Sequence, residues 1–150
     1  MDMAKEKCNI LLAEDDEDDF FFMQRAFNRA ALPVAVQRVA DGEEAICYLA
    51  GERGYSDRQK HPLPQIAILD IKMPRKTGFE VLTWIWQHPE IKRLVVLVLS
   101  SSNQARDVNL AYELGANSFI VKSAEFDRLT MMIHTLLEYW FTICERPEMV

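Results

Sequence analysis

The stretch ILLAEDDEDDFF, residues 10–21, joins an apolar segment to six consecutive carboxylates and then returns to hydrophobic residues. The apolar part lacks polar alternation, which is typical of a strand buried on both faces. Six like charges in a row repel one another and usually belong to solvated segments. A buried strand that ends directly in acidic residues therefore directs attention to the carboxyl end of that strand.

The same kind of apolar stretch recurs along the chain. Residues 8–13, 65–70, 94–100 and 118–122 are rich in Ile, Leu and Val, and a weaker stretch occupies 34–39. Each is followed by a segment with helical spacing, so strand and helix alternate five times. Parallel neighbours need right-handed helical crossovers, so five such units favour an α/β fold with a doubly wound parallel sheet. We expect the strand order 2-1-3-4-5.

Glycine and proline mark the boundaries of the predicted helices. The five helices are expected over about 17–31, 41–51, 78–88, 103–115 and 124–145. The irregular stretch 51–65 contains two Gly and two Pro and is predicted to be a surface loop. We expect residues 1–150 to form a single domain with a core of about 8–124, an extended C-terminal helix of about 124–145 and no output domain.

The composition excludes several classes of protein. With 49% hydrophobic and 27% charged residues, the 150-residue chain is typical of one globular domain. A net charge of −6 argues against a nucleic-acid partner. The charged N-terminus is unlike a signal peptide, and no apolar stretch approaches the ~18 residues of a membrane span. The three cysteines show no CxxC spacing that would suggest a zinc site or a disulfide framework. We therefore expect a cytoplasmic protein with no membrane partner.

Five polar side chains stand at the predicted strand ends. Glu14 and Asp15 follow the first strand, Asp70 ends the third, Ser100 the fourth and Lys122 the fifth. With the order 2-1-3-4-5, these side chains face one crevice. Crowded carboxylates raise one another's pKa unless a cation intervenes, and Mg²⁺ suits a site of one or two carboxylates that leaves room for water and a phosphoryl oxygen.

In these residues the sequence resembles the response-regulator receiver domains of two-component signalling, which have the CheY-like variant of the flavodoxin-like fold. The resemblance covers essentially the whole chain. It rests on motifs that are weak singly and strong as an ordered set: Glu14-Asp15 after ILLA, Asp70 in LDIKMPRKTG with Met73, Pro74 and Gly78, Ser100 in VLSSS, and Lys122 in FIVKS.

The resemblance implies a role for each site residue. Asp70 would be the phosphoacceptor, attacking the phosphohistidine of a sensor histidine kinase. Asp15 and Asp70 would bind Mg²⁺ together with the backbone carbonyl of Lys72, and Glu14 would assist through water. The protein would then catalyse only its own phosphorylation and dephosphorylation, and would not be an enzyme for other substrates.

The product of that transfer would be held and reported by other residues. The resemblance implies that Ser100 and Lys122 hold the phosphoryl group and that Ser100 and Phe119 form the switch. Many receivers have Tyr at the switch position, so Phe119 keeps the aromatic ring and lacks the hydroxyl. Output would then depend on a changed binding surface.

A narrower likeness concerns the partner kinase. The ILLAEDDEDD opening, the long loop before the third strand, Ser123 in place of the usual Pro and the LLEYWF ending resemble single-domain regulators that partner bacterial phytochrome kinases. This likeness implies a sensor histidine kinase of phytochrome type as partner; the downstream protein is not indicated.

The remaining acidic residues have a separate explanation. Asp16 is the predicted N-cap of the first helix, and residues 17–19 lie in its first turn, where the helix dipole favours negative charge. We expect this part of the acidic stretch to be solvated and to take no part in cation binding.

The last predicted helix is apolar over a wide arc. One stripe fits a core-facing surface. It comprises Leu129, Met132, Ile133, Leu136, Leu137, Trp140, Phe141 and Cys144. Met131, Tyr139 and Ile143 extend the apolar surface beyond that stripe, as expected of a helix that also covers a partner. We favour a homodimer through this helix over a monomer.

Two other functions remain open. One is a phosphorylation-independent adaptor with the same fold, although the complete set of site residues argues against it. The other is a Mg²⁺-dependent phosphatase with an aspartate nucleophile, similar to haloacid-dehalogenase-like hydrolases. Those enzymes have a second acid two residues after the nucleophile, where this chain has Lys72.

Overall fold

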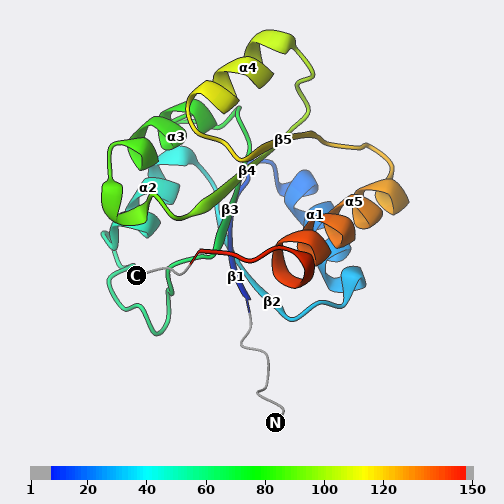
Figure 1. Ribbon diagram of the computed structural model, residues 1–150, viewed down its shortest axis with the longest axis horizontal. Helices are drawn as coiled ribbons and strands as arrows, with labels where there is room; N and C mark the ends of the chain where they lie inside the picture. The colour runs from blue at the N-terminus through cyan, green and yellow to red at the C-terminus, as the bar shows by residue number, and fades with distance from the viewer. Residues whose placement is uncertain (1–7, 148–150) are drawn as a thin grey trace.

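The computed structural model describes residues 8–147, so the charged segment 1–7 lies outside the described residues. Five strands form one parallel sheet in the order β2-β1-β3-β4-β5, which confirms the predicted topology (Figure 1). The strands are β1 (Cys8–Ala13), β2 (Val34–Val39), β3 (Ile66–Leu69), β4 (Val95–Ser100) and β5 (Ser118–Val121).

Helices cover both faces of the sheet. They are α1 (Glu17–Ala30), α2 (Gly42–Ala50), α3 (Gly78–Trp86), the short 3₁₀ helix η1 (Pro89–Ile91), α4 (Ala105–Glu113), α5 (Phe126–Glu138) and the π-helical turn η2 (Tyr139–Ile143). Figure 1 shows α1 and α5 against one face and α2, α3 and α4 against the other. No helix within residues 8–147 is long and apolar enough to cross a membrane.

The alternation of side chains along each strand divides the core in two. On β1, Leu11 and Ala13 pack with residues of α2 and α3, while Ile10 and Leu12 pack with residues of α1 and α5. Successive strand residues point to opposite faces, so a strand between two helical layers must be apolar throughout. This requirement explains why β1, β3 and β4 are almost fully buried.

The fifth strand departs from the prediction of burial on both faces. Its residues Ser118, Phe119 and Ile120 are half-buried and Val121 is exposed. β5 is an edge strand with only β4 as a neighbour, and it follows α4, which buries only Ala111. The apolar sequence of this strand therefore coincides with a partly exposed surface.

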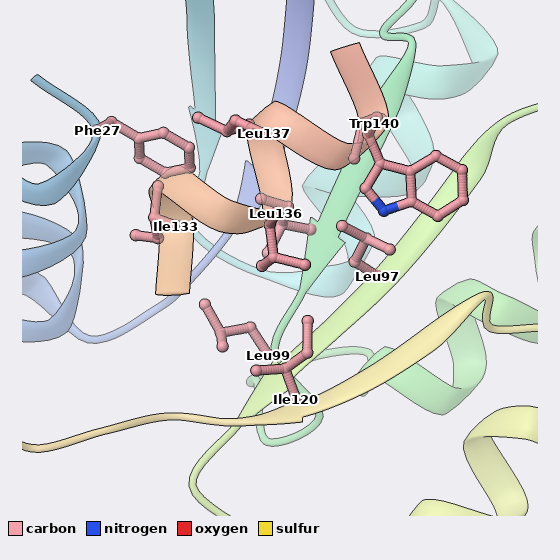
Figure 2. Close-up of a pocket in the computed structure, with 10 residues that line it drawn as sticks. Phe27, Leu97, Leu99, Ile120, Ile133, Leu136, Leu137 and Trp140 are labelled. Atoms are coloured by element: carbon pink, nitrogen blue, oxygen red, sulfur yellow. The ribbon is translucent and has the colours of Figure 1, made fainter. Parts of the chain in front are cut away.

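The C-terminal helix packs mainly through the predicted stripe. Figure 2 shows the side chains that meet beneath α5, contributed by α1, α5, η2, β4 and β5: Phe27, Leu97, Leu99, Ile120, Ile133, Leu136, Leu137 and Trp140. They leave a cavity of about 10 Å³, about the space of one water-sized sphere. This cavity is a gap in core packing and is too small for a ligand.

Two helices begin later than predicted because serine side chains hold the preceding turns. α4 starts at Ala105, two residues beyond Asn103, and the Gln104 amide donates to Ser102 Oγ over 3.3 Å. α5 starts at Phe126, and the amide of Glu125 donates to Ser123 Oγ over 3.2 Å. Such local side-chain bonds compete with the first helical turn.

Candidate functional site

The register of the sheet brings the first and third strand ends together. Ala13 pairs with Leu69, so Glu14 and Asp70 are the next residues of two neighbouring strands. The Asp70 amide donates to the Ala13 carbonyl over 3.1 Å and continues the ladder past the strand end. The acidic residues of β1 and β3 therefore lie side by side because of strand pairing, as the sequence predicted.

Three carboxylates form a cluster at this edge. One oxygen each from Glu14, Asp15 and Asp70 lies within 4.8 Å of the other two. Glu14 is 1% exposed, Asp70 is half-buried and Asp15 is exposed to solvent. The cluster is thus buried on one side and open on the other.

Lys122, which follows β5, inserts its ammonium into this cluster. Nζ donates to the Glu14 carboxylate and lies 3.2 Å from Asp70 Oδ2. The Lys122 amide also donates to the Ser100 carbonyl over 2.8 Å, which fixes the start of the loop after β5. The predicted grouping of Lys122 with the acidic residues is confirmed.

Burial and charge shift the pKa values of Glu14 and Lys122. Burial raises the pKa of Glu14 to about 7, although the hydrogen bond and the charge of Lys122 act in the opposite direction. Burial lowers the pKa of Lys122, but the hydrogen bond to Glu14 and the charge on Asp70 outweigh it and raise that pKa above its ordinary value. Lys122 therefore stays charged at neutral pH, and Glu14 holds a proton to higher pH than an ordinary glutamate does.

Asp19 takes a part in the site that the sequence did not predict. Asp16 is the N-cap of α1 as predicted, and its Oδ1 accepts from the Asp19 amide over 2.9 Å. Asp19 Oδ2, however, lies 3.2 Å from Lys122 Nζ, so Asp19 is a third carboxylate partner of the ammonium. The expectation that all of residues 16–19 are only solvated was wrong for Asp19, because the first turn of α1 faces the end of β5.

The backbone around Asp70 is tightly packed. Asp70 Oδ1 accepts from the amide of Ile71 over 2.7 Å, which orients the carboxylate. A Cβ atom added to Gly78 would meet the Asp70 carbonyl oxygen at 2.3 Å, closer than real contacts allow. Gly78, which the sequence singled out, is therefore required for the approach of α3 to the loop that carries Asp70.

Ser100 and Phe119 lie on the neighbouring strands β4 and β5. Ser100 is buried at the end of β4, and its Oγ accepts from the amide of Ser102 over 3.3 Å. Phe119 packs its ring against the core on the α2–α4 side. Its amide donates to the hydroxyl of Tyr112 on α4 over 3.1 Å. The sequence analysis missed Tyr112; its spacing of seven residues from Phe119, across the turn between α4 and β5, was the available signal.

The donor set fits a hard divalent cation. Carboxylate oxygens are the preferred ligands of Mg²⁺, and an open side leaves positions for water or a phosphoryl oxygen. Glu14, Asp15 and Asp70 offer three such oxygens. Lys72 is exposed in the loop after Asp70, and the role of its backbone carbonyl stays a prediction.

A parallel sheet ordered 2-1-3-4-5, with an acidic pair after β1, Asp70 after β3 and a lysine after β5, is the arrangement that the resemblance to receiver domains implies. The profile of the response regulator receiver domain matches residues 10–134. The chain therefore belongs to the response regulator receiver domain family.

Relatives of similar length match this chain over nearly its whole length. The response regulator Rcp1 of Synechocystis sp. is 31% identical over 92% of this chain and 92% of its own length. The phosphorylated cyanobacterial phytochrome response regulator RcpA is 34% identical, with a TM-score of 0.87 over 95% of this chain and 99% of RcpA.

Two further solved structures have the same fold throughout. The response regulator RPA3017, from red light signalling in R. palustris, has a TM-score of 0.89 at 32% identity, covering 94% of this chain and 99% of its own. The Mn²⁺-bound form of Rcp1 has a TM-score of 0.83 at 30% identity, with coverage of 94% and 99%.

Proposed function

We propose that this receiver accepts a phosphoryl group from a sensor histidine kinase at Asp70, with Mg²⁺ as cofactor. The observation that carries the proposal is the position of Asp70, whose carboxylate stands between the acidic residues of β1 and the ammonium of Lys122. No other carboxylate within residues 8–147 is both part of the three-acid cluster and directly after the central strand β3.

The transfer needs a nucleophile and a stabilised phosphoryl group. An Asp70 carboxylate oxygen attacks phosphorus, and a P–O bond forms while the P–N bond to the kinase histidine breaks. The electron pair of that bond returns to the imidazole, which takes up a proton. Lys122 donates to an oxygen of the phosphoryl group, and Asp70 ends as an acyl phosphate.

Asp15 and Asp70 would hold the cation with the Lys72 carbonyl as a further ligand, and Glu14 would assist through water. Bound Mg²⁺ neutralises the crowded carboxylates and the charge on the phosphoryl oxygens. The related Rcp1 is known in a Mn²⁺-bound form, which supports a divalent cation as cofactor.

The signal would leave through a changed surface. Ser100 lies at the end of β4 beside the site, and its hydroxyl would turn to the phosphoryl group, biasing the face formed by α4 and β5. Phe119 on β5 would follow that change, and its amide is already linked to α4 through Tyr112. The protein would then act by phosphorylation-dependent binding in a phosphorelay, and not as an enzyme for other substrates.

The partner kinase would be of phytochrome type. RcpA is a phytochrome response regulator and RPA3017 belongs to red light signalling, and both match nearly the whole of this chain. We place the protein in the cytoplasm, where ATP-dependent phosphorylation of a kinase histidine takes place.

The C-terminal helix would also form a homodimer. Met131 and Ile143 are each 69% exposed, Tyr139 is 48% exposed, and Val121 on the edge strand β5 is 43% exposed. Burial of this surface against a second copy would stabilise the pair. Sedimentation at high micromolar concentration should give a dimer that Met131→Glu dissociates, whereas a monomeric wild type would contradict this arrangement.

Intact-mass measurement after incubation with acetyl phosphate and Mg²⁺ tests the proposed function. We expect a gain of about 80 Da, one phosphoryl group. The gain should be lost in Asp70→Asn and kept in Asp127→Asn, a control at an exposed carboxylate at the start of α5. Absence of a gain in the wild type would favour the adaptor, and turnover of a generic phosphate ester would favour the phosphatase.

A further inference from the structure

Arg38, the penultimate residue of β2, contacts the segment that carries the acidic pair. Its Nε donates to the Glu14 carbonyl over 3.1 Å, and its Nη2 lies 3.5 Å from the Asp15 carbonyl. Its Nη1 forms an ion pair with Glu17 Oε1 at 2.9 Å. One guanidinium therefore bonds to three residues of the loop and first turn between β1 and α1.

The underside of the guanidinium is also held in place. The Arg38 guanidinium carbon lies 4.4 Å from the centroid of the Phe20 ring, within the range of a cation–π contact. The Arg38 side chain is only 18% exposed. A planar group fixed by three acceptors and a ring has little freedom, so the loop it contacts is restrained as well.

The backbone of Glu14 is fastened to β2 from both sides. The Glu14 amide donates to the Val39 carbonyl over 3.1 Å, and the Glu14 carbonyl accepts from Arg38 Nε. The pairing of Ala13 with Val39 ends the β1–β2 ladder. The bond from Arg38 therefore attaches β2 to Glu14, one residue beyond the last paired residue of β1. The direction in which Glu14 and Asp15 present their carboxylates depends on this hold.

We propose that Arg38 is a positioning residue for the divalent cation site: it fixes the Glu14-Asp15 backbone so that both carboxylates point at the place where the cation binds beside Asp70. The proposal rests on the proposed function, in which this site binds Mg²⁺. Arg38 contacts ligand-bearing residues through their carbonyls and does not itself bind the cation. Groups that orient metal ligands in this way commonly change metal affinity by 10–100-fold when they are removed.

The charge of Arg38 weakens Mg²⁺ binding, whereas its restraint on the loop strengthens it. Because the two effects have opposite signs, they can be tested separately. A guanidinium near the site repels Mg²⁺, so removal of its charge alone would tighten binding. Loss of the restraint on the loop would weaken binding. Arg38→Gln removes both the positive charge and the planar set of guanidinium donors. Arg38→Lys keeps the charge but loses that set of donors.

Isothermal titration calorimetry with Mg²⁺ separates these effects. We expect about tenfold weaker binding in Arg38→Lys, and a smaller loss in Arg38→Gln because removal of the repulsive charge offsets part of the effect. Arg53→Gln, which removes an exposed arginine paired with Glu43, should bind as the wild type does. Phe20→Leu, which removes the ring beneath the guanidinium and keeps an apolar side chain against the core, should weaken binding about threefold and gives a second measurement if the Arg38 variants fail to fold.

Unfolding in EDTA distinguishes positioning from general destabilisation. A positioning role predicts that Mg²⁺ affinity falls even where the metal-free stability of a variant matches that of the wild type. Tighter binding in Arg38→Gln with unchanged binding in Arg38→Lys would overturn the proposal, since Arg38 would then act by charge alone. Wild-type affinity in all variants would overturn it too, while a wild type that binds no Mg²⁺ would overturn the proposed function as well.

Discussion

Lys122 Nζ lies 3.2 Å from Asp70 Oδ2, so the nucleophile and the cation that would stabilise its product are already in contact. The same ammonium is bonded to Glu14 and paired with Asp19. A phosphoryl group on Asp70 would bring new oxygens to this ammonium. Transfer would therefore exchange carboxylate partners of Lys122 for phosphoryl oxygens, without a long movement of the side chain.

Lys122→Met should separate cation binding from phosphoryl transfer. Without the ammonium, its repulsion of Mg²⁺ disappears, so we expect binding of Mg²⁺ to become several-fold tighter. Transfer from acetyl phosphate should slow by about a hundredfold, because a donor to the phosphoryl oxygens is lost. Calorimetry and the time course of intact mass check the two effects; parallel changes in both would contradict separate roles.

The acidic stretch should divide by function. Asp15 belongs to the carboxylate cluster, whereas Asp18 is exposed in the first turn of α1. Asp15→Asn should weaken Mg²⁺ binding at least tenfold, and the matched variant Asp18→Asn should leave it nearly unchanged. Calorimetric titration measures the Mg²⁺ affinity of both variants. Equal losses would show that the acidic stretch attracts the cation by its total charge and not through Asp15 as a ligand.

Metal-free stability should depend on pH through Glu14. Folding raises the pKa of Glu14 from 4.5 to about 7, so the folded state binds more protons than the unfolded chain between these values. The stabilisation is fully present below pH 4.5 and is lost as the pH rises through about 7. Against Glu14→Gln in EDTA, the wild type should lose roughly 2–3 kcal/mol over this range. A constant difference between the two in urea unfolding would contradict the raised pKa.

The link between α4 and β5 should depend on the Tyr112 hydroxyl. In Tyr112→Phe the amide of Phe119 loses its acceptor, which costs about 1 kcal/mol. Hydrogen exchange at the Phe119 amide should accelerate about fivefold, while Tyr139→Phe, at an exposed tyrosine of η2, should leave it unchanged. Equal protection of the Phe119 amide in Tyr112→Phe and the wild type would show that the Tyr112 hydroxyl does not link α4 to β5.

The sequence predicted the order of the strands in the sheet and the side chains that meet at the strand ends. Apolar stretches place β1, β3 and β4 in the sheet, and their pairing makes Glu14 and Asp70 neighbours with no further information. The approach of Lys122 follows from the position of β5 beside β4 in the same way. These predictions succeeded because the pairing of parallel strands places residues at corresponding strand ends next to one another.

Contacts made by helices across the sheet edge were harder to predict. Asp19 reaches Lys122 because α1 packs against α5, and Arg38 reaches the Glu14 carbonyl through the conformation of a long side chain, which strand order alone does not specify. Both look like solvated charges when read along the chain. The bond between Tyr112 and Phe119 likewise depends on the tilt of α4 over β5, which no hydrophobic period specifies.

Mapping the residue that carries the phosphoryl group is the most direct test of Asp70 as the phosphoacceptor. The wild type would be phosphorylated with acetyl phosphate and Mg²⁺, reduced with borohydride, which converts an aspartyl phosphate to homoserine, and mapped by peptide sequencing in a mass spectrometer. We expect homoserine at position 70 and unmodified Asp15. Homoserine at another position, or none in a protein that has gained phosphate, would contradict Asp70 as the phosphoacceptor.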